Sequence, residues 1–195
     1  MEALGDAKRA EQAAEQLAHT DTLTGLPNRR ALEKRLQEIS QQADADRQYG
    51  VLFIDGDNFK RINDELGHAR GDEVLQGSAK VIMEAVRAGE GGRDKAYRLG
   101  GDEFVVLMYL GPQGNSRRTD QLTTSEQLGR VGERVHGELT AFLQENPDIA
   151  ALDYGLSIGA AWPDGTSTLA KMLETAEGNM RDAKQGNHDI NGSYR

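Results

Sequence analysis

The chain has 195 residues, enough for one domain with an appendage, and its 37% hydrophobic and 28% charged residues are ordinary for a globular protein. A formal net charge of −9 argues against binding a nucleic-acid polymer, because such binders carry basic stripes, although a metal ion can still bring a nucleotide to an acidic protein. The absence of cysteine excludes disulfides and thiolate metal sites, and no apolar run approaches transmembrane length. These features predict a cytoplasmic chain that makes no membrane contact of its own.

The first predicted element is a polar helix over residues 1–19, in which alanines recur at alternating spacings of four and three. This pattern is a weak heptad seam, and a frayed, solvent-exposed helix explains it equally well. If the chain is part of a longer protein, this helix would join it to an upstream sensor domain. Gly25 and Pro27 break the pattern, and a second helix follows with Leu32 on its apolar face.

Residues 50–55 predict a central strand, because a short apolar run there ends in the carboxylate of Asp55. The carboxyl end of such a strand is the usual place for a functional loop in proteins of mixed helices and strands. Helical patterning resumes soon afterwards. We expect it to be interrupted at Gly67 and Gly71 and to run on from Asp72.

Two further apolar runs flank a Gly-Gly pair and predict a β-hairpin. Gly100 and Gly101 accept positive φ at the centre of a tight turn without strain. Asp102 and Glu103 follow the turn directly and precede a buried strand over residues 104–110. Carboxylates on a rigid turn suit a magnesium site. Taken alone, the stretch is better explained as an ordinary hairpin with a solvated acidic tip.

The remaining pattern predicts a mobile loop over residues 111–125, an amphipathic helix from Leu128 that stops near Pro147, a strand over 154–161 and a helix over 168–185. Strands and helices thus alternate around at least one hairpin. The predicted class is therefore α+β, with a ferredoxin-like mixed sheet flanked by helices.

Several motifs stand in a fixed order along this chain: DTLTGLPNRR at 21–30, the acid- and glycine-rich run at 55–72, GGDEF at 100–104, Ser-Ile-Gly at 157–159 and Ala-Lys at 183–184. Together they resemble the GGDEF family of diguanylate cyclases, which join two GTP molecules into cyclic di-GMP. The resemblance implies a cyclase domain over 20–188, with a fold like the palm of adenylyl cyclases and polymerases. The N-terminal 1–19 would be a linker or signalling helix and 189–195 a polar tail.

The resemblance also implies two Mg²⁺ ions per site, or Mn²⁺ in their place, held by Asp55, the carbonyl of Gly56 and Asp102. Hard oxygen ligands on converging strands suit Mg²⁺, and a metal pair can activate a 3′-hydroxyl while steadying an α-phosphate. Asp102 would in addition be the general base, with Glu103 beside it as a second ligand or helper. The alternative for Asp55 is a solvated acid at a strand end.

The same resemblance assigns a GTP site. Asn63 and Asp72 would read guanine, whose N1–H and N2–H₂ donors need acceptors, and adenine would leave the carboxylate unpaired. Asp72 is also a candidate helix N-cap, and His68 would either lie near the ribose or make a structural hydrogen bond. Asp57 and Asp64 are expected to be solvated or capping. The other expected GTP contacts are the phosphate-binding backbone of Phe59 and Lys60 at a helix start, Gly100, Gly101 and the side chain of Lys184. The alternative for Lys184 is a solvated lysine that matches the dipole at a helix end.

The sequence departs from the family at the site where some members bind product as an inhibitor. Asp94 stands at the aspartate of the family's Arg-x-x-Asp motif, but Gly91 replaces its arginine. The neighbouring Arg93 is no substitute, because a shift of one position reverses a side chain in an extended segment. We therefore expect weak or absent product inhibition. Asn187 and His188 also stand where the family has an arginine after its phosphate-binding lysine.

Three hypotheses for function follow. In the first, two subunits of a homodimer each bind GTP, each 3′-hydroxyl attacks the opposite α-phosphate, and the products are cyclic di-GMP and two pyrophosphates. In the second, the chain is a catalytically silent GGDEF module that binds GTP or relays a signal, but the intact motif at 100–104 favours activity. In the third, Asp55 is the nucleophile of a phosphatase. Such a motif needs Thr or Val soon after Asp57, which the sequence does not supply.

Overall fold

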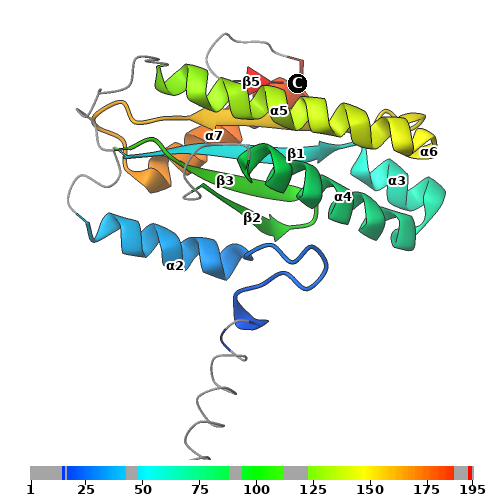
Figure 1. Cartoon of the computed structure of the whole chain (residues 1–195), viewed down its shortest axis with the longest axis horizontal. Helices are drawn as coiled ribbons and strands as arrows, with labels where there is room; N and C mark the ends of the chain where they lie inside the picture. Colours follow the sequence, from blue (N-terminus) through cyan, green and yellow to red (C-terminus); the bar gives the residue numbers. More distant parts are fainter. Residues whose placement is uncertain are drawn as a thin grey trace, which may run out of the picture.

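The computed structural model describes residues 15, 17–42, 48–87, 94–111, 123–186 and 193–194. Most of the predicted N-terminal helix and of the predicted loop at 111–125 lies outside these ranges, as do Gly91, Arg93, Asn187 and His188. In chain order the elements are α2 (Arg29–Ser40), β1 (Tyr49–Asp57), α3 (Phe59–Leu66), α4 (His68–Arg87), β2 (Lys95–Gly100), β3 (Glu103–Tyr109), α5 (Thr124–Glu145), α6 (Pro147–Ala150), β4 (Gly155–Ala161), α7 (Leu169–Lys184) and β5 (Ser193–Tyr194) (Figure 1).

The strands form one five-stranded sheet in the order β2-β3-β1-β4-β5. The α+β class is confirmed, but every strand pair in this sheet is antiparallel, where a mixed sheet was expected. β1 and β2 do run in the same direction, as alternating strands and helices predict. They are not neighbours, because the hairpin returns β3 between them. The two-residue β5 lies within the predicted polar tail at 189–195 and pairs with β4.

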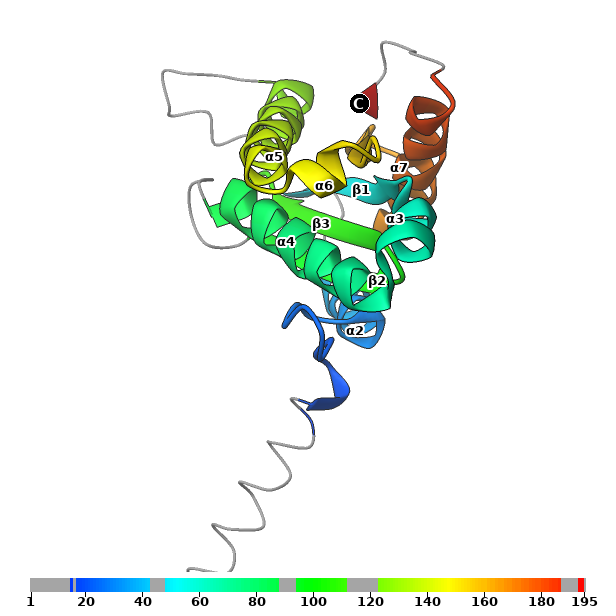
Figure 2. The same ribbon diagram turned by 90° about the vertical axis from the view of Figure 1, so that its right-hand side faces the viewer.

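The sheet lies between two layers of helices, α4 and α5 on one face and α2 and α7 on the other (Figure 2). Alternation along β1 explains the division. Leu52 and Ile54 belong to the cluster that α4 and α5 cover, while Val51 and Phe53 belong to the cluster with α2 and α7. β1 is therefore apolar on both faces up to Ile54, and the first acid follows at the edge of the core. None of the helices in the described ranges is both long and apolar enough to span a bilayer.

The helical region after β1 differs in one respect from expectation. Gly67 separates α3 from α4 with φ of +84°, as predicted, but α4 begins at His68 and runs through Gly71. The physical reason is a close contact between the two helices. A Cβ at Gly71 would lie 2.0 Å from Oδ1 of Asn63, so the missing side chain at this position makes room for the amide.

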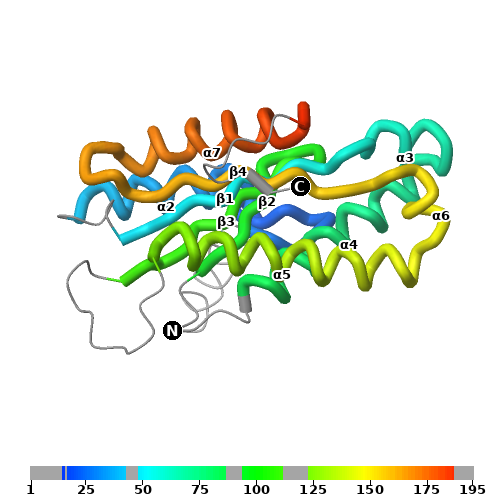
Figure 3. The backbone as a smooth tube through the Cα atoms, turned by 90° about the horizontal axis from the view of Figure 1, so that it is seen from above, coloured from blue at the N-terminus to red at the C-terminus, as the bar shows by residue number. Residues whose placement is uncertain are grey.

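α7 lies directly on β4, and the view from above shows the two side by side (Figure 3). A Cβ at Gly159 would lie 2.1 Å from the carbonyl oxygen of Ala176 and 2.2 Å from the backbone nitrogen of Met180. Asn179 adds a hydrogen bond from Nδ2 to the carbonyl oxygen of Ala160, at 2.8 Å. The position of Lys184, at the end of α7, is therefore set by backbone contact rather than by side chains alone.

Candidate active site at the end of the central strand

Asp55 and Asp102, the two acids expected to share a metal site, both lie at the carboxyl end of β1. The backbone N–H of Gly56 donates to the carbonyl oxygen of Asp102 at 3.2 Å. A Cβ at Gly56 would lie 3.0 Å from Cβ of Asp102 and 3.1 Å from its Oδ2. The glycine thus forms a cradle in which the Asp102 carboxylate rests against the strand.

The surroundings of these acids shift their pKa values. Burial, and after it the negative charge of Asp55, raises the pKa of Asp102. Burial also raises the pKa of Glu103, although the guanidinium of Arg29, with its Nη2 3.6 Å from the carboxylate oxygen, opposes the effect. Like charges therefore gather here at a real electrostatic cost, which a bound cation would relieve.

A cation of the protein itself already contacts this cluster. The ammonium of Lys184 forms an ion pair with Oδ1 of Asp55, donates to the carbonyl oxygen of Gly56 at 3.1 Å and lies 3.9 Å from Oδ1 of Asp57. Burial lowers the pKa of Lys184, but the contact with Asp55 and the charges of Asp57 and Asp102 outweigh burial and raise it. The two hydrogen-bond acceptors of this ammonium, on Asp55 and Gly56, belong to residues expected to bind metal.

Asp57 is not the solvated or capping acid that the sequence suggested. Its side chain is only 14% exposed, and both of its oxygens accept from the buried hydroxyl of Ser157 at 2.9 Å. The signal was present in the spacing, because residues 55 and 57 of a strand point to the same face. Asp64, in contrast, is exposed on α3.

The donor set fits a hard divalent cation. In the described part of the chain, no three acidic or histidine side chains come together as a metal-binding group. A site here therefore depends on the expected combination of the Asp55 and Asp102 carboxylates with the Gly56 carbonyl. Two of these three groups, the Asp55 carboxylate and the Gly56 carbonyl, already contact the ammonium of Lys184. Oxygen ligands of this kind suit Mg²⁺.

The predicted hairpin is confirmed: β2 and β3 pair antiparallel, with φ of +145° at Gly100 and +54° at Gly101. Both glycines are exposed. Glu103 begins β3 and pairs with Asp55 of β1, which places it beside the acid cluster. Arg29 at the start of α2 contacts Glu103 and also donates from Nε to the carbonyl oxygen of Leu99, at 3.3 Å. The turn is thus supported from α2.

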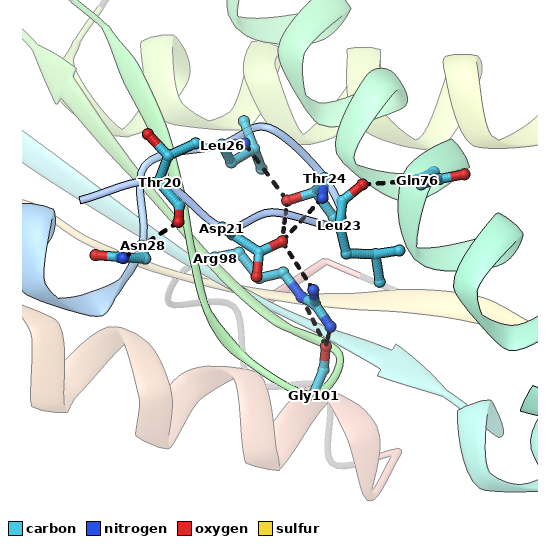
Figure 4. A network of polar contacts seen from close by, with 9 residues as sticks. All are labelled: Thr20, Asp21, Leu23, Thr24, Leu26, Asn28, Gln76, Arg98 and Gly101. Atoms are coloured by element: carbon cyan, nitrogen blue, oxygen red, sulfur yellow. Dashed lines mark hydrogen bonds and ion pairs between the residues drawn. The ribbon is translucent and has the colours of Figure 1, made fainter. Parts of the chain in front are cut away.

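Arg98 is the main residue of the site that sequence reasoning missed (Figure 4). Its Nη1 donates to Oδ1 of Asp21 at 2.8 Å, while Nε and Nη2 donate to the carbonyl oxygen of Gly101 at 3.0 and 2.7 Å. The same Asp21 oxygen accepts from the backbone N–H of Thr24 at 2.9 Å and from its hydroxyl at 2.6 Å. Gln76 of α4 donates to the carbonyl oxygen of Leu23 at 3.1 Å. The turn that carries the first motif is therefore fastened to the hairpin.

The residues expected to bind guanine and ribose lie on α3 and α4. Asn63 is half-buried, while His68 and Asp72 are exposed in the first turns of α4. Asp72 lies inside this helix, so the N-cap alternative for it is wrong. The predicted guanine role of Asn63 and Asp72 stays a prediction, as does the ribose role of His68.

The phosphate contacts were expected at the start of α3, and the local geometry there is suitable. Asn58 precedes the helix with φ of +59° and makes no side-chain cap, since its amide donates instead to the carbonyl oxygen of Asp153 at 2.8 Å. The first N–H groups of α3 are thus not covered by that side chain. Phe59 is half-buried against the core and Lys60 is exposed.

Asp94 lies directly before β2 and has a structural partner. The backbone N–H of Tyr109 donates to its Oδ1 at 2.8 Å. Burial raises the pKa of Asp94. This hydrogen bond gives Asp94 a structural role that needs no inhibitory product. Gly91, which stands at the arginine position of the same motif, lies outside the described residues.

Comparison with known proteins agrees with these observations. The chain is 38% identical over 165 residues to the diguanylate cyclase DgcN of Escherichia coli. The matched region covers 84% of this chain and 36% of DgcN. It is 38% identical over 170 residues to the diguanylate cyclase TpbB of Pseudomonas aeruginosa, covering 86% of this chain and 35% of TpbB. The chain thus spans about a third of the length of these two relatives.

A solved structure of the GGDEF domain of TpbB matches 86% of this chain and 90% of that domain, with a TM-score of 0.64 and 34% identity. The model of the family described as "Diguanylate cyclase, GGDEF domain" matches residues 18–189. The chain therefore belongs to the GGDEF domain family of diguanylate cyclases.

Proposed function

We propose that this chain is an active diguanylate cyclase, which condenses two GTP into cyclic di-GMP and two pyrophosphates. The observation that carries the proposal is the cluster at the end of β1. There Asp55, the carbonyl of Gly56 and Asp102 gather beside an intact GGDEF hairpin, and a cation of the protein contacts two of them. Oxygen ligands and a positive charge in one place are what a triphosphate with its metal requires.

The metal ligands would be Asp55, the Gly56 carbonyl and Asp102, with two Mg²⁺ ions, or Mn²⁺ in their place. Bound there, such ions supply Lewis-acid chemistry: they neutralise charge on the phosphates and activate a hydroxyl. The chain supplies the rest of the reaction. The carboxylate of Asp102 would accept the proton of the 3′-hydroxyl, as a general base within reach of that group does.

The hairpin provides orientation. Arg98 binds the carbonyl of Gly101, the residue directly before the general base, and Arg29 holds Glu103 next to Asp55 as the helper or second ligand. Groups fixed in advance in this way lower the reorganisation needed during reaction. Gly100 and Gly101 lack side chains, which leaves their backbone open to the nucleotide.

GTP would bind across the starts of α3 and α4. Asn63 and Asp72 accept from the guanine edge, His68 lies near the ribose, and the backbone of Phe59 and Lys60 donates to the phosphates. Lys184 would bind a phosphate after leaving Asp55. A nucleotide lacking the guanine donors would leave two acceptors unpaired, so this site would select GTP over ATP.

The reaction joins two nucleotides, so two such sites must face each other and a homodimer is needed at least transiently. The segment at 1–19 would link the domain to an upstream sensor and align the two copies. We place the protein in the cytoplasm, where GTP is available. Product should inhibit it only weakly, since Asp94 lacks the arginine partner at 91.

The decisive experiment incubates the purified chain with GTP and Mg²⁺ and measures cyclic di-GMP and pyrophosphate. Wild type should form both, and Asp102→Ala should lose product by about 100-fold or more while still binding GTP. Asp64→Ala, an exposed acid on α3, is the matched control and should retain activity. GTP binding without product would favour the silent module, and an unaffected Asp102→Ala would refute the role of this residue. Loss of GTP preference over ATP in Asp72→Ala tests the guanine pocket separately.

A further inference from the structure

Lys184 occupies the place where the proposed function requires a metal ion. Its ammonium pairs with Oδ1 of Asp55, lies 3.1 Å from the Gly56 carbonyl oxygen and reaches to within 3.9 Å of Asp57. Asp55 and the Gly56 carbonyl are two of the three proposed metal ligands.

We propose that Lys184 is a tethered cation that competes with the divalent ion for Asp55 and Gly56 and passes to the triphosphate when the ion enters. The inference rests on the proposed function and deepens it. Without nucleotide the lysine neutralises the site and weakens metal binding. With metal bound, the released ammonium is available to the phosphates, so metal and GTP each strengthen the binding of the other.

The packing of α7 fixes the backbone at Lys184 but leaves the end of its side chain able to move. Ala183, directly before the lysine, is fully buried, and the close approach at Gly159 fixes the helix backbone on β4. The Lys184 side chain itself is 40% exposed, and a lysine carries its charge on a flexible four-carbon stem. The ammonium can therefore leave Asp55 without any movement of the helix.

The charges at the site explain why the lysine and a metal ion would exclude each other. The Asp55 side chain is 14% exposed, so charges close to it are only partly screened by water. An ion placed on Asp55 and the Gly56 carbonyl would meet the ammonium at the same two oxygens. Since like charges at contact distance repel strongly, one of the two cations must withdraw.

The test measures binding of Mn²⁺ alone, by the electron paramagnetic resonance signal of the free ion, in the absence of nucleotide. Lys184→Met should bind Mn²⁺ about five- to tenfold more tightly than wild type, because the competitor is gone. Lys171→Met is the matched control: it removes the same charge from the same helix at an exposed position paired with Glu174, and should change the affinity less than about twofold. Thermal unfolding checks that both variants are folded.

The proposal would be overturned by equal or weaker Mn²⁺ binding by Lys184→Met, by an equal gain in Lys171→Met, or by no binding to any of the proteins. Adding Asp55→Asn to Lys184→Met should abolish the tighter binding, and retention of it would place the ion elsewhere and also refute the inference. A non-hydrolysable GTP analogue should strengthen Mn²⁺ binding in wild type more than in Lys184→Met.

Formation of cyclic di-GMP by wild type is measured separately. An active enzyme whose Lys184→Met variant binds Mn²⁺ no more tightly would refute the competition and leave the proposed function intact. Tighter Mn²⁺ binding by the variant of a chain that makes no product would support the competition and refute the cyclase.

Discussion

Gly159→Ala should be strongly destabilising, because α7 and β4 touch through their backbones at this position. The added Cβ would lie 2.1 Å from the Ala176 carbonyl oxygen and 2.2 Å from the Met180 nitrogen. Both atoms would have to move away by about 1 Å to reach even the shortest contacts found in packed interiors. Neither can do so by a side-chain rotation, since both belong to the helix backbone.

The expected cost follows from how such a clash is relieved. Overpacking in a protein core typically costs about 1–3 kcal/mol, and a backbone clash belongs at the upper end, near about 3 kcal/mol. Moving α7 away would also loosen the buried side chains of Met172 and Met180 and shift the base of Lys184. With an m value of about 2 kcal/mol/M, the midpoint of urea unfolding should fall by about 1.5 M.

The assay is urea unfolding followed by circular dichroism, with Gly178→Ala as the control. Gly178 lies on the same helix, and nothing is within 4 Å of its added Cβ. This variant should gain about 0.5–1 kcal/mol from the better helix propensity of alanine. A Gly159→Ala protein as stable as wild type would refute the close-contact reasoning, and destabilisation of both variants would point to a general intolerance of α7.

Three further predictions concern the turn and the core. Arg98→Met should lower the unfolding free energy, measured by urea unfolding, by about 2–3 kcal/mol, because Asp21 and the Gly101 carbonyl lose the guanidinium of a side chain that is only 10% exposed. The control Arg61→Met removes only exposed ion pairs and should cost under about 1 kcal/mol. Equal costs of the two variants would contradict the argument. Hydrogen bonds from neighbours outweigh burial and hold the pKa of Asp21 below its usual 3.8, so its contribution is present above that pH and lost as the pH falls through the folded-state pKa. The stability difference between wild type and Asp21→Asn should therefore shrink below about pH 4, and a constant difference would refute the assignment. Ser78→Ala leaves the buried hydroxyl of Tyr154 without its 2.7 Å partner and should cost about 1–3 kcal/mol of thermal stability, whereas a neutral effect would mean that the hydroxyl finds another partner.

Local pattern in the sequence was enough for the main elements. Glycine at 100 and 101 permits the turn, and the apolar run ending at Asp55 marks the central strand, which the structure extends to Asp57. Gly71 shows the limit of such reasoning. A glycine inside a helical pattern usually signals a break. Here the space that a side chain at Gly71 would take is occupied by Asn63 of the preceding helix. Local sequence pattern does not reveal such a contact between helices.

The sequence by itself determined the α+β class, the hairpin and the motifs of the family, because each depends on backbone preferences and residue types within a short window. Only the tertiary structure decided that β3 lies between β1 and β2, that Arg98 joins Asp21 to the hairpin, and that Lys184 rests on Asp55. These contacts join segments far apart in the chain. Strand register and helix packing set them, so they exist only once the whole core has formed.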